Sequence, residues 1–296
     1  MIKLDVRLVA PLLAIGLAAC GTVGEGQVSS TAIAAHQPVA TAQRQSAVSI
    51  AQTEPRVPRA FAMSPAYLAS ELSTVEEAIR LPSLPQTDYA SLGARQQTAY
   101  HMLEARPEWI PNVLDAVPPL IRPAIEANLT AAQQIGTLNG VSTALPHWKI
   151  IAPPAPEVLL SYYQETQQTY GVAWQYLAAI NLIETNMGRI QGLSSAGAQG
   201  PMQFMPATWA YYGRGDVNNP HDAIVAAGRY LHAHGGPQDM TRAVYAYNPS
   251  MLYVRAVQLY AQQMFDNART FLAYYNWQVY VPTAAGNTLL PVGFSG

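Results

Sequence analysis

The sequence of 296 residues is 50% apolar and 11% charged, with a formal net charge of −2. This length allows one sizeable domain with appendages or two small domains, and the apolar content is ample for a core. Acidic and basic residues are interspersed, so the sequence offers no basic face of the kind that dominates nucleic-acid affinity, and we exclude nucleic acid as a partner.

Residues 1–20 have the pattern of a bacterial export signal. A short charged start precedes the apolar run LVAPLLAIGLAAC, which contains Pro11 and Gly16 and is too short for a stable membrane anchor. The run ends at Cys20, the only cysteine of the sequence, and LAAC resembles the end of a lipoprotein signal peptide. A single cysteine cannot form an internal disulfide, so lipidation explains Cys20 better than redox chemistry does. We therefore expect a lipid-anchored, extracytoplasmic protein of the cell envelope; the alternative is an ordinary secretory signal with a chance cysteine.

The next two segments differ in composition. Residues 21–65 are rich in Ala, Ser, Thr, Gln and Val without helical periodicity, and we interpret them as a flexible tether. Residues 66–145 predict a helical N-terminal region, with helices near 66–80, 94–105 and 120–136 separated by proline-rich stretches.

Residues 146–275 form the predicted main domain, and residues 276–296 a C-terminal tail. The apolar periodicity of the main domain again predicts helices. These are expected at 157–170, 173–187, 206–211, 222–232 (with Asp222 as a helix cap) and 253–265. No convincing run of alternating strands occurs, so we predict a mostly α fold.

Glu184 lies in an otherwise apolar part of the predicted helix 173–187. At 100° per residue, Leu177, Ile180, Glu184 and Met187 fall within an arc of about 80°, so the carboxylate shares the core-facing side of the helix. A carboxylate in that position is costly unless it is paired, hydrogen-bonded or protonated. Glu184 is therefore expected to be either a structural ion-pair partner or a catalytic group.

The residue four positions after Glu184 is Gly188, which has no side chain to cover the carboxylate. An apolar wall with one open side raises a carboxyl pKa and suits a general acid near neutral pH. The structural alternative is an ion pair with a nearby arginine, such as Arg189 or Arg229.

The segment 192–209 is dense in small residues and then supplies Gln203 between Met202 and Phe204. Glycines such as Gly200 allow backbone conformations and close approaches that a Cβ would block. A groove for a sugar polymer needs such backbone access, amide hydrogen bonds and apolar or aromatic platforms. The Met and Phe side chains can equally belong to the core.

Three motifs in this order carry a family resemblance: ETNMG (184–188), SSAGAQGPMQFMPATW (194–209) and AVYAYNPSMLYV (243–254). Together they resemble the transglycosylase SLT domain of bacterial lytic murein transglycosylases, here in a lipoprotein form, over about residues 156–264. The resemblance implies a goose-type-lysozyme-like helical fold and peptidoglycan glycan strands as the partner.

The resemblance also implies roles for particular residues. Glu184 is implied as the catalytic acid and base, followed by Thr185 where many members have serine. A glycan groove is implied beside it. The residues implied in or near that groove are Ser195, Ala198, Met202, Gln203, Tyr247 and Asn248.

The chemistry fits a single carboxylate. Glycoside hydrolases in the usual scheme need two carboxylates, whereas Asp216, Asp222 and Asp239 lie in segments outside the motif of Glu184. A lone Glu can protonate the leaving oxygen and then remove a proton from a hydroxyl of the same sugar. In the resembled family this yields a 1,6-anhydro product. The alternatives are a muramidase-type hydrolase and a catalytically silent envelope lipoprotein that binds glycan.

We expect no metal and no other cofactor. His232 and His234 are two positions apart, so on a helix their side chains point in different directions, and no third ligand is evident. The tyrosines of the main domain, Tyr253 among them, are interpreted mainly as packing or rim residues.

Overall fold

The computed structural model describes residues 63–296. The signal peptide, Cys20 and nearly all of the tether predicted at 21–65 lie outside the described residues, so these predictions stay untested. Within residues 63–296 the structure has eleven α-helices and two small antiparallel sheets, which confirms the mostly α fold. No helix of this part combines the length and apolarity needed to span a bilayer.

The N-terminal helices begin at Ser64, whose side chain accepts a hydrogen bond from the Tyr67 N–H and caps the first helix. The predicted helices are present, but the second begins five residues earlier than predicted because Tyr89 and Leu92 are buried. The elements are α1 Pro65–Ile79, η1 Gln86–Asp88, α2 Tyr89–Glu104, η2 Pro107–Trp109, α3 Ile110–Ala116 and α4 Arg122–Asn139.

The main domain contains every helix that the sequence predicts and two further short ones, α9 and α11. The elements are α5 Pro156–Tyr170, α6 Trp174–Thr185, α7 Pro206–Tyr212, α8 Pro220–Ala233, α9 Met240–Tyr247, α10 Met251–Asp266 and α11 Thr270–Tyr275. The N-cap prediction for α8 was wrong. Asn219, not Asp222, accepts the hydrogen bonds of the first turn, because Pro220 occupies the first helical position.

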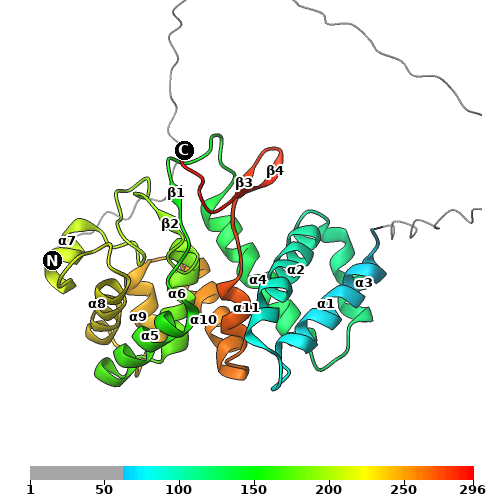
Figure 1. Ribbon diagram of the computed structural model, residues 1–296, viewed down its shortest axis with the longest axis horizontal. Helices are drawn as coiled ribbons and strands as arrows, with labels where there is room; N and C mark the ends of the chain where they lie inside the picture. Colours follow the sequence, from blue (N-terminus) through cyan, green and yellow to red (C-terminus); the bar gives the residue numbers. More distant parts are fainter. Residues whose placement is uncertain (1–62) are drawn as a thin grey trace, which may run out of the picture. The chain divides into compact units, whose positions relative to one another are not determined.

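The N-terminal helices and the main domain share one hydrophobic core. Helix α10 packs against α4 and also against α6, and buried residues from α1 to α11 form a continuous cluster. In Figure 1, α4, α10 and α11 lie between α1–α3 on one side and α7–α9 on the other. The helices before α5 are therefore part of the same folded body as α6.

The two sheets are small. Strand β1 (Lys149–Ile150) pairs with β2 (Ile190–Gln191), and β3 (Val279–Thr283) pairs with β4 (Gly286–Leu290). Residues 276–296, predicted as a tail, thus contain a hairpin. Its Val279, Val281 and Leu290 pack against Ile150 in a separate small core.

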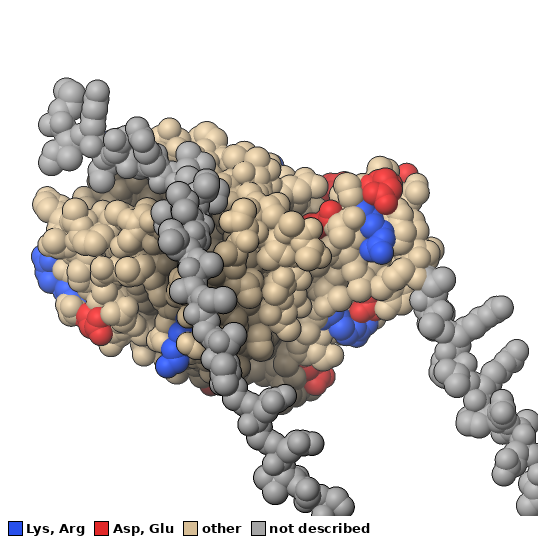
Figure 2. Space-filling view, turned by 90° about the horizontal axis from the view of Figure 1, so that it is seen from above, with Lys and Arg blue, Asp and Glu red and all other residues tan. Residues whose placement is uncertain are grey.

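The low charge of the sequence is visible on the surface. Figure 2 shows a face on which Lys, Arg, Asp and Glu are few and scattered among uncharged residues. A surface of this kind offers hydrogen bonds and apolar contacts to a ligand and little net electrostatic attraction.

Candidate active site

Helix α6 places Glu184 one residue before its end. The helix stops at Thr185, two residues earlier than predicted, because Asn186, Met187 and Gly188 have positive φ of 52°, 62° and 84°. Gly188 therefore lies outside the helix. The prediction that Gly188 leaves Glu184 uncovered, because it follows four residues later on the same helix face, was wrong. Residues Leu177, Ile180 and Met187 are fully buried, as the wheel predicts, while Glu184 is half-buried.

The end of α6 is tied to the glycine-rich loop. The Thr185 Oγ1 donates to the carbonyl of Pro201 at 2.6 Å, and the Asn181 Nδ2 donates to the same oxygen at 2.8 Å. The Gly188 N–H donates in turn to Thr185 Oγ1 at 3.1 Å. A hydroxyl after Glu184 thus joins the helix end, its turn and the loop that follows.

The carboxylate of Glu184 has one hydrogen-bond partner among the described residues. The Tyr253 hydroxyl, on α10, donates to Glu184 Oε1 at 2.5 Å. Burial raises the pKa of Glu184 to about 7, and the hydrogen bond from Tyr253 opposes that rise. A carboxyl group with this pKa is protonated in a large fraction of molecules near neutral pH and can act as a general acid.

No cation neutralises Glu184. None of the ion pairs within residues 63–296 includes this carboxylate. The Arg189 guanidinium stacks on the ring of Tyr275, and Arg229 bonds the Tyr170 hydroxyl and the Tyr212 carbonyl. The structural alternative for Glu184, an ion pair with either arginine, is therefore wrong.

Sequence reasoning missed the role of Tyr253, which was grouped with packing residues. Its ring is 1% exposed, so it does pack, but its hydroxyl reaches the carboxylate across 69 positions of sequence. The only local signal was its place in the third motif, on the helix that follows Asn248.

The loop before α7 depends on glycine and on an unusual Gln203. Gly200 has φ of +71°, and a Cβ there would lie 1.9 Å from the Val217 carbonyl oxygen, so no other residue fits. Gln203 also has a positive φ of 49°, and its Nε2 donates to the Gly200 carbonyl at 2.9 Å. This bond holds the Gln203 amide against the loop.

Tyr247 joins the loop to α9. Its hydroxyl donates to the Met202 carbonyl at 2.6 Å, and its ring packs edge-on against Phe204 and Tyr230. The pKa of Tyr247 is raised by burial and further by the negative charge of Glu184, so its phenol lies within electrostatic range of the carboxylate.

A cavity of about 300 Å³ opens beside this cluster, between the loop and α9. Both Gln203 and Tyr247 line it, whereas Glu184 is not among the lining residues. Aromatic and apolar side chains form most of its wall, as a platform for sugar faces requires. The lining residues are Gln203, Phe204, Met205, Thr208, Tyr230, Tyr245, Ala246, Tyr247 and Pro249.

The other residues implied by the resemblance are not on this wall. Met202 is fully buried and presents only its carbonyl to Tyr247, while Ala198 is 8% exposed and bonds Ser194 through its backbone. Ser195 is exposed on the loop, and Asn248 is half-buried at the end of α9. The structure thus brings Gln203, Tyr247 and the Met202 carbonyl together. Glu184 is linked to the same loop through the bond of its neighbour Thr185 to the Pro201 carbonyl.

The remaining carboxylates of the main domain have other partners. Asp222 accepts the Asp216 N–H and contacts His221, and Asp239 caps α9 through the Arg242 N–H. These bonds hold Asp222 and Asp239 at the starts of their own helices, α8 and α9. No charged group contributes to the pKa of Glu184.

The described residues contain no group of three or more His, Cys, Asp or Glu able to hold a metal ion. The two histidines considered from the sequence bond separate carbonyls: His232 faces that of Tyr170 and His234 that of Tyr230.

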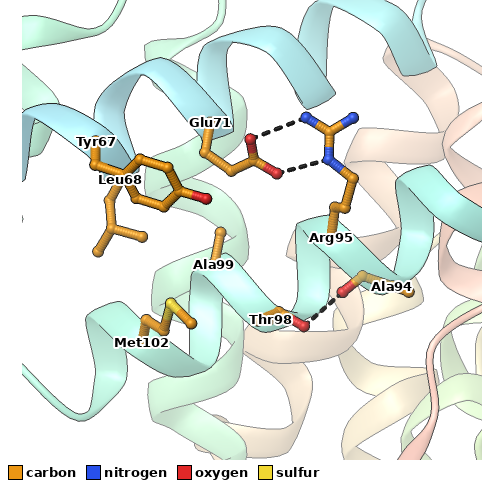
Figure 3. Close-up of a pocket in the computed structure, with 8 residues that line it drawn as sticks. All are labelled: Tyr67, Leu68, Glu71, Ala94, Arg95, Thr98, Ala99 and Met102. Atoms are coloured by element: carbon orange, nitrogen blue, oxygen red, sulfur yellow. Dashed lines mark hydrogen bonds and ion pairs between the residues drawn. The ribbon is translucent and has the colours of Figure 1, made fainter. Parts of the chain in front are cut away.

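A further cavity, of about 250 Å³, lies between α1 and α2, away from the motif residues. Figure 3 shows the ion pair of Glu71 with Arg95 across one end of it, above Thr98, Ala99 and Met102. The rest of its lining is Tyr67, Leu68 and Ala94, and none of the motif residues contributes to it.

Residues 161–267 match the family model of the Transglycosylase SLT domain, from within α5 to the end of α10. The chain therefore contains an SLT domain with the lysozyme-like helical fold of that family. The activity associated with this domain is lytic transglycosylation, and its binding partner is the glycan strand of peptidoglycan. Comparison with curated proteins and with solved structures gives no significant match.

Proposed function

We propose that this protein is a lytic transglycosylase that cleaves the β-1,4 bond between N-acetylmuramic acid and N-acetylglucosamine and forms a 1,6-anhydro product. The observation that carries the proposal is the state of Glu184. It is a half-buried carboxyl with a pKa of about 7 and no cationic partner among residues 63–296, and its neighbour Thr185 bonds the loop that carries Gln203 to the cavity wall.

In the proposed reaction Glu184 acts twice. As an acid it gives its proton to the glycosidic oxygen O4 of N-acetylglucosamine while the bond from C1 of N-acetylmuramic acid to that oxygen breaks. As a carboxylate it then takes the proton of the O6 hydroxyl of the same muramic sugar while O6 bonds to C1. Glu184 is thereby returned to its starting form, and no water is consumed.

The surrounding residues support both steps. The Tyr253 hydroxyl donates to the carboxylate, so it orients Glu184 and stabilises the ionised form that takes the second proton. Gln203 and Tyr247, on the cavity wall, are proposed to contact the glycan. Ser195 and Asn248 are proposed to contact the glycan beyond the cavity wall. The buried Ala198 and Met202 are proposed to support the loop, Met202 through its carbonyl bond to Tyr247.

Digestion of purified peptidoglycan followed by mass analysis of the fragments tests the reaction type. The wild-type chain is expected to give 1,6-anhydro products. Glu184→Gln is expected to lower turnover by about a thousandfold or more while glycan binding stays within a few fold, since general acid and base catalysis are both lost. Glu165→Gln is the matched control, because that carboxylate is exposed on α5 and pairs only with His221.

Other products would select the alternatives. Reducing-end muramic products, heavier by one water, would identify a muramidase-type hydrolase. Glycan binding without any cleavage by the wild-type chain would identify a silent glycan-binding protein. Turnover retained in Glu184→Gln would remove the role proposed for this residue.

We also propose that the mature chain is anchored to a membrane by a lipid on Cys20 and acts in the cell envelope. The support is the sequence pattern LAAC at the end of an apolar run, with the only cysteine of the chain at its end. Mass spectrometry of the N-terminal peptide is expected to show a diacylglyceryl-modified Cys20, and Cys20→Ser is expected to leave the membrane fraction. An unmodified Cys20 in the mature protein would contradict the anchor.

A further inference from the structure

The turn that follows Glu184 is strained. Asn186, Met187 and Gly188 take left-handed φ values in succession, and Met187 is neither a glycine nor an asparagine. A residue of that kind in the left-handed region is strained and persists only where the surrounding structure holds it in place. The position of the Glu184 carboxylate therefore depends on contacts that fix this turn.

One of those contacts comes from beyond the SLT domain. The Asn186 Nδ2 donates to the backbone carbonyl of Gln278 at 2.9 Å. Gln278 directly precedes strand β3 and lies 11 positions after the last residue of the domain match, Asn267. The end of the helix that carries Glu184 is thus tied to the start of the C-terminal hairpin.

The peptide groups of Gln278 are themselves held by a single side chain of α2. The Gln97 Oε1 accepts the Gln278 N–H at 2.7 Å, and the Gln97 Nε2 donates to the Gln278 carbonyl at 2.9 Å. Gln97 is only 7% exposed, so these bonds are shielded from water. Next to it, the Trp277 Nε1 donates to Gln96 Oε1 at 2.9 Å and holds the same segment to α2.

An amide is the side chain that can make both bonds of Gln97. It offers one acceptor and one donor in a plane, whereas an ionised carboxylate offers acceptors only and an aliphatic side chain offers neither. The carbonyl of Gln278 accepts from Gln97 and from Asn186 together, so the two amides meet at one oxygen.

We propose that Gln97, acting through Gln278 and Asn186, is a positioning residue that fixes the turn after Glu184 and so sets the carboxylate for both proton transfers. The inference rests on the proposed function and adds residues outside the matched range 161–267 to the apparatus of the site. Displacements of about 1 Å at a reacting group lower turnover by as much as a hundredfold, so loss of this clamp is expected in kcat more than in KM.

Three variants of the full-length chain test the proposal, with kcat and KM measured from the release of 1,6-anhydro product. Gln97→Leu removes both bonds and is expected to lower kcat about tenfold or more, with KM changed less than twofold. Thr98→Ala is the matched control, since this neighbour on α2 is exposed and bonds only the Ala94 carbonyl; it is expected to keep wild-type kcat and KM.

Gln97→Glu tests the positioning role through the pH dependence of kcat, which a merely structural role of Gln97 would not change. A protonated carboxyl has one donor and one acceptor, like the amide it replaces, while the ionised form would face the Gln278 carbonyl without a donor. Burial of position 97 is expected to raise the pKa of the introduced carboxyl above its ordinary value. The ratio of variant to wild-type kcat is therefore expected to be highest at pH 5 and to fall at least fivefold by pH 8. Taking the ratio at each pH cancels the titration of Glu184 and of His101 and Glu104, which contact the hairpin from α2.

The outcomes are distinct. Wild-type kcat in Gln97→Leu, or a pH-independent ratio in Gln97→Glu, would overturn the positioning role. If Gln97→Leu does not fold, the pH dependence of the kcat ratio of Gln97→Glu to wild type still tests the positioning role. Absence of anhydro product from the wild-type chain would instead overturn the proposed function, before any variant is compared.

Discussion

Glu76 on α1 and Glu184 on α6 are both carboxylates on core-facing helix surfaces, and the protein treats them in opposite ways. Glu76 is fully buried and accepts bonds from Arg80, Gln96 at 2.9 Å and Tyr100. Glu184 is half-buried and receives one bond, from Tyr253. The first carboxylate is saturated with donors, and the second keeps most of its hydrogen-bonding capacity for another molecule.

The comparison explains how burial leads to different roles. A buried carboxylate that accepts bonds from a cation and several donors joins elements together, here α1, α2 and, through the bond of Arg80 to Gln263, α10. A carboxylate that burial desolvates without a cation has its pKa raised and can exchange a proton near neutral pH. The arginine, present at one site and absent at the other, makes the difference.

The largest expected effect on stability is at Glu76. Glu76→Gln removes the ion pair with Arg80 and turns amide hydrogens toward the donors of Gln96 and Tyr100, so the free energy of unfolding is expected to fall by about 3 kcal/mol. Urea unfolding measures the change. Glu71→Gln is the control, since the Glu71–Arg95 pair between α1 and α2 leaves 20% and 42% of its two side chains exposed, and its loss is expected to cost less than about 1 kcal/mol. Equal effects at the two positions would contradict the structural role of Glu76.

Replacing Glu184 is expected to change the free energy of unfolding by a smaller amount and in the opposite direction. The pKa of its carboxyl in the folded chain is about 7, above the ordinary value of 4.5, so the folded state binds this proton more tightly than the unfolded state. The stability that this contributes is fully present below pH 4.5 and is lost as the pH rises to 7. Glu184→Gln cannot ionise, so it is expected to raise the free energy of unfolding by about 2 kcal/mol at pH 8.

Urea unfolding of wild type and Glu184→Gln at pH 4 and pH 8 checks this prediction. The difference between the two chains isolates Glu184, because burial also raises the pKa of Glu104 to about 7 and both chains share that contribution. A variant less stable than wild type at pH 8 would mean that partners stabilise the ionised carboxylate of Glu184.

The smallest effect is expected at Tyr253. Tyr253→Phe removes the donor that favours the ionised form of Glu184, which is expected to raise the pKa of this carboxyl further, by an amount equivalent to about 1 kcal/mol. At high pH, kcat/KM is expected to fall because Glu184 loses its proton. In Tyr253→Phe this fall is expected at a higher pH than in wild type. Tyr260→Phe, further along α10, is the control, and a shift of the same size in that variant would contradict the assignment.

The sequence predicts the fold well because the helices depend on local apolar periodicity and on nearby caps and breakers. The predicted helix 157–170, for example, ends where Gly171 takes a left-handed conformation with φ of 72°. The family match confirms the resemblance found in the three motifs, and two residues from the second and third motifs, Gln203 and Tyr247, line one cavity. Their roles in the reaction stay predictions.

The parts that sequence reasoning missed depend on contacts between distant segments. Tyr253 reaches Glu184 from another helix, and Gln97 reaches Gln278 across 181 positions. The early end of α6 at Thr185 has the same origin, because Thr185 and Asn181 bond the carbonyl of Pro201 in the loop. Apolar periodicity within one segment carries no information on such distant partners, so the predicted helix extended to Met187.

Titration of the Glu184 carboxyl tests the central claim most directly. Chains labelled with ¹³C at glutamate carboxyl carbons are compared with the same chains carrying Glu184→Gln, so that the signal lost in the variant identifies Glu184. The account predicts that this signal titrates with a midpoint near pH 7, since the carboxyl is desolvated and lacks a cation. A midpoint at or below 4.5 would show a carboxylate ionised throughout the working range, and Glu184 would not be the proton donor.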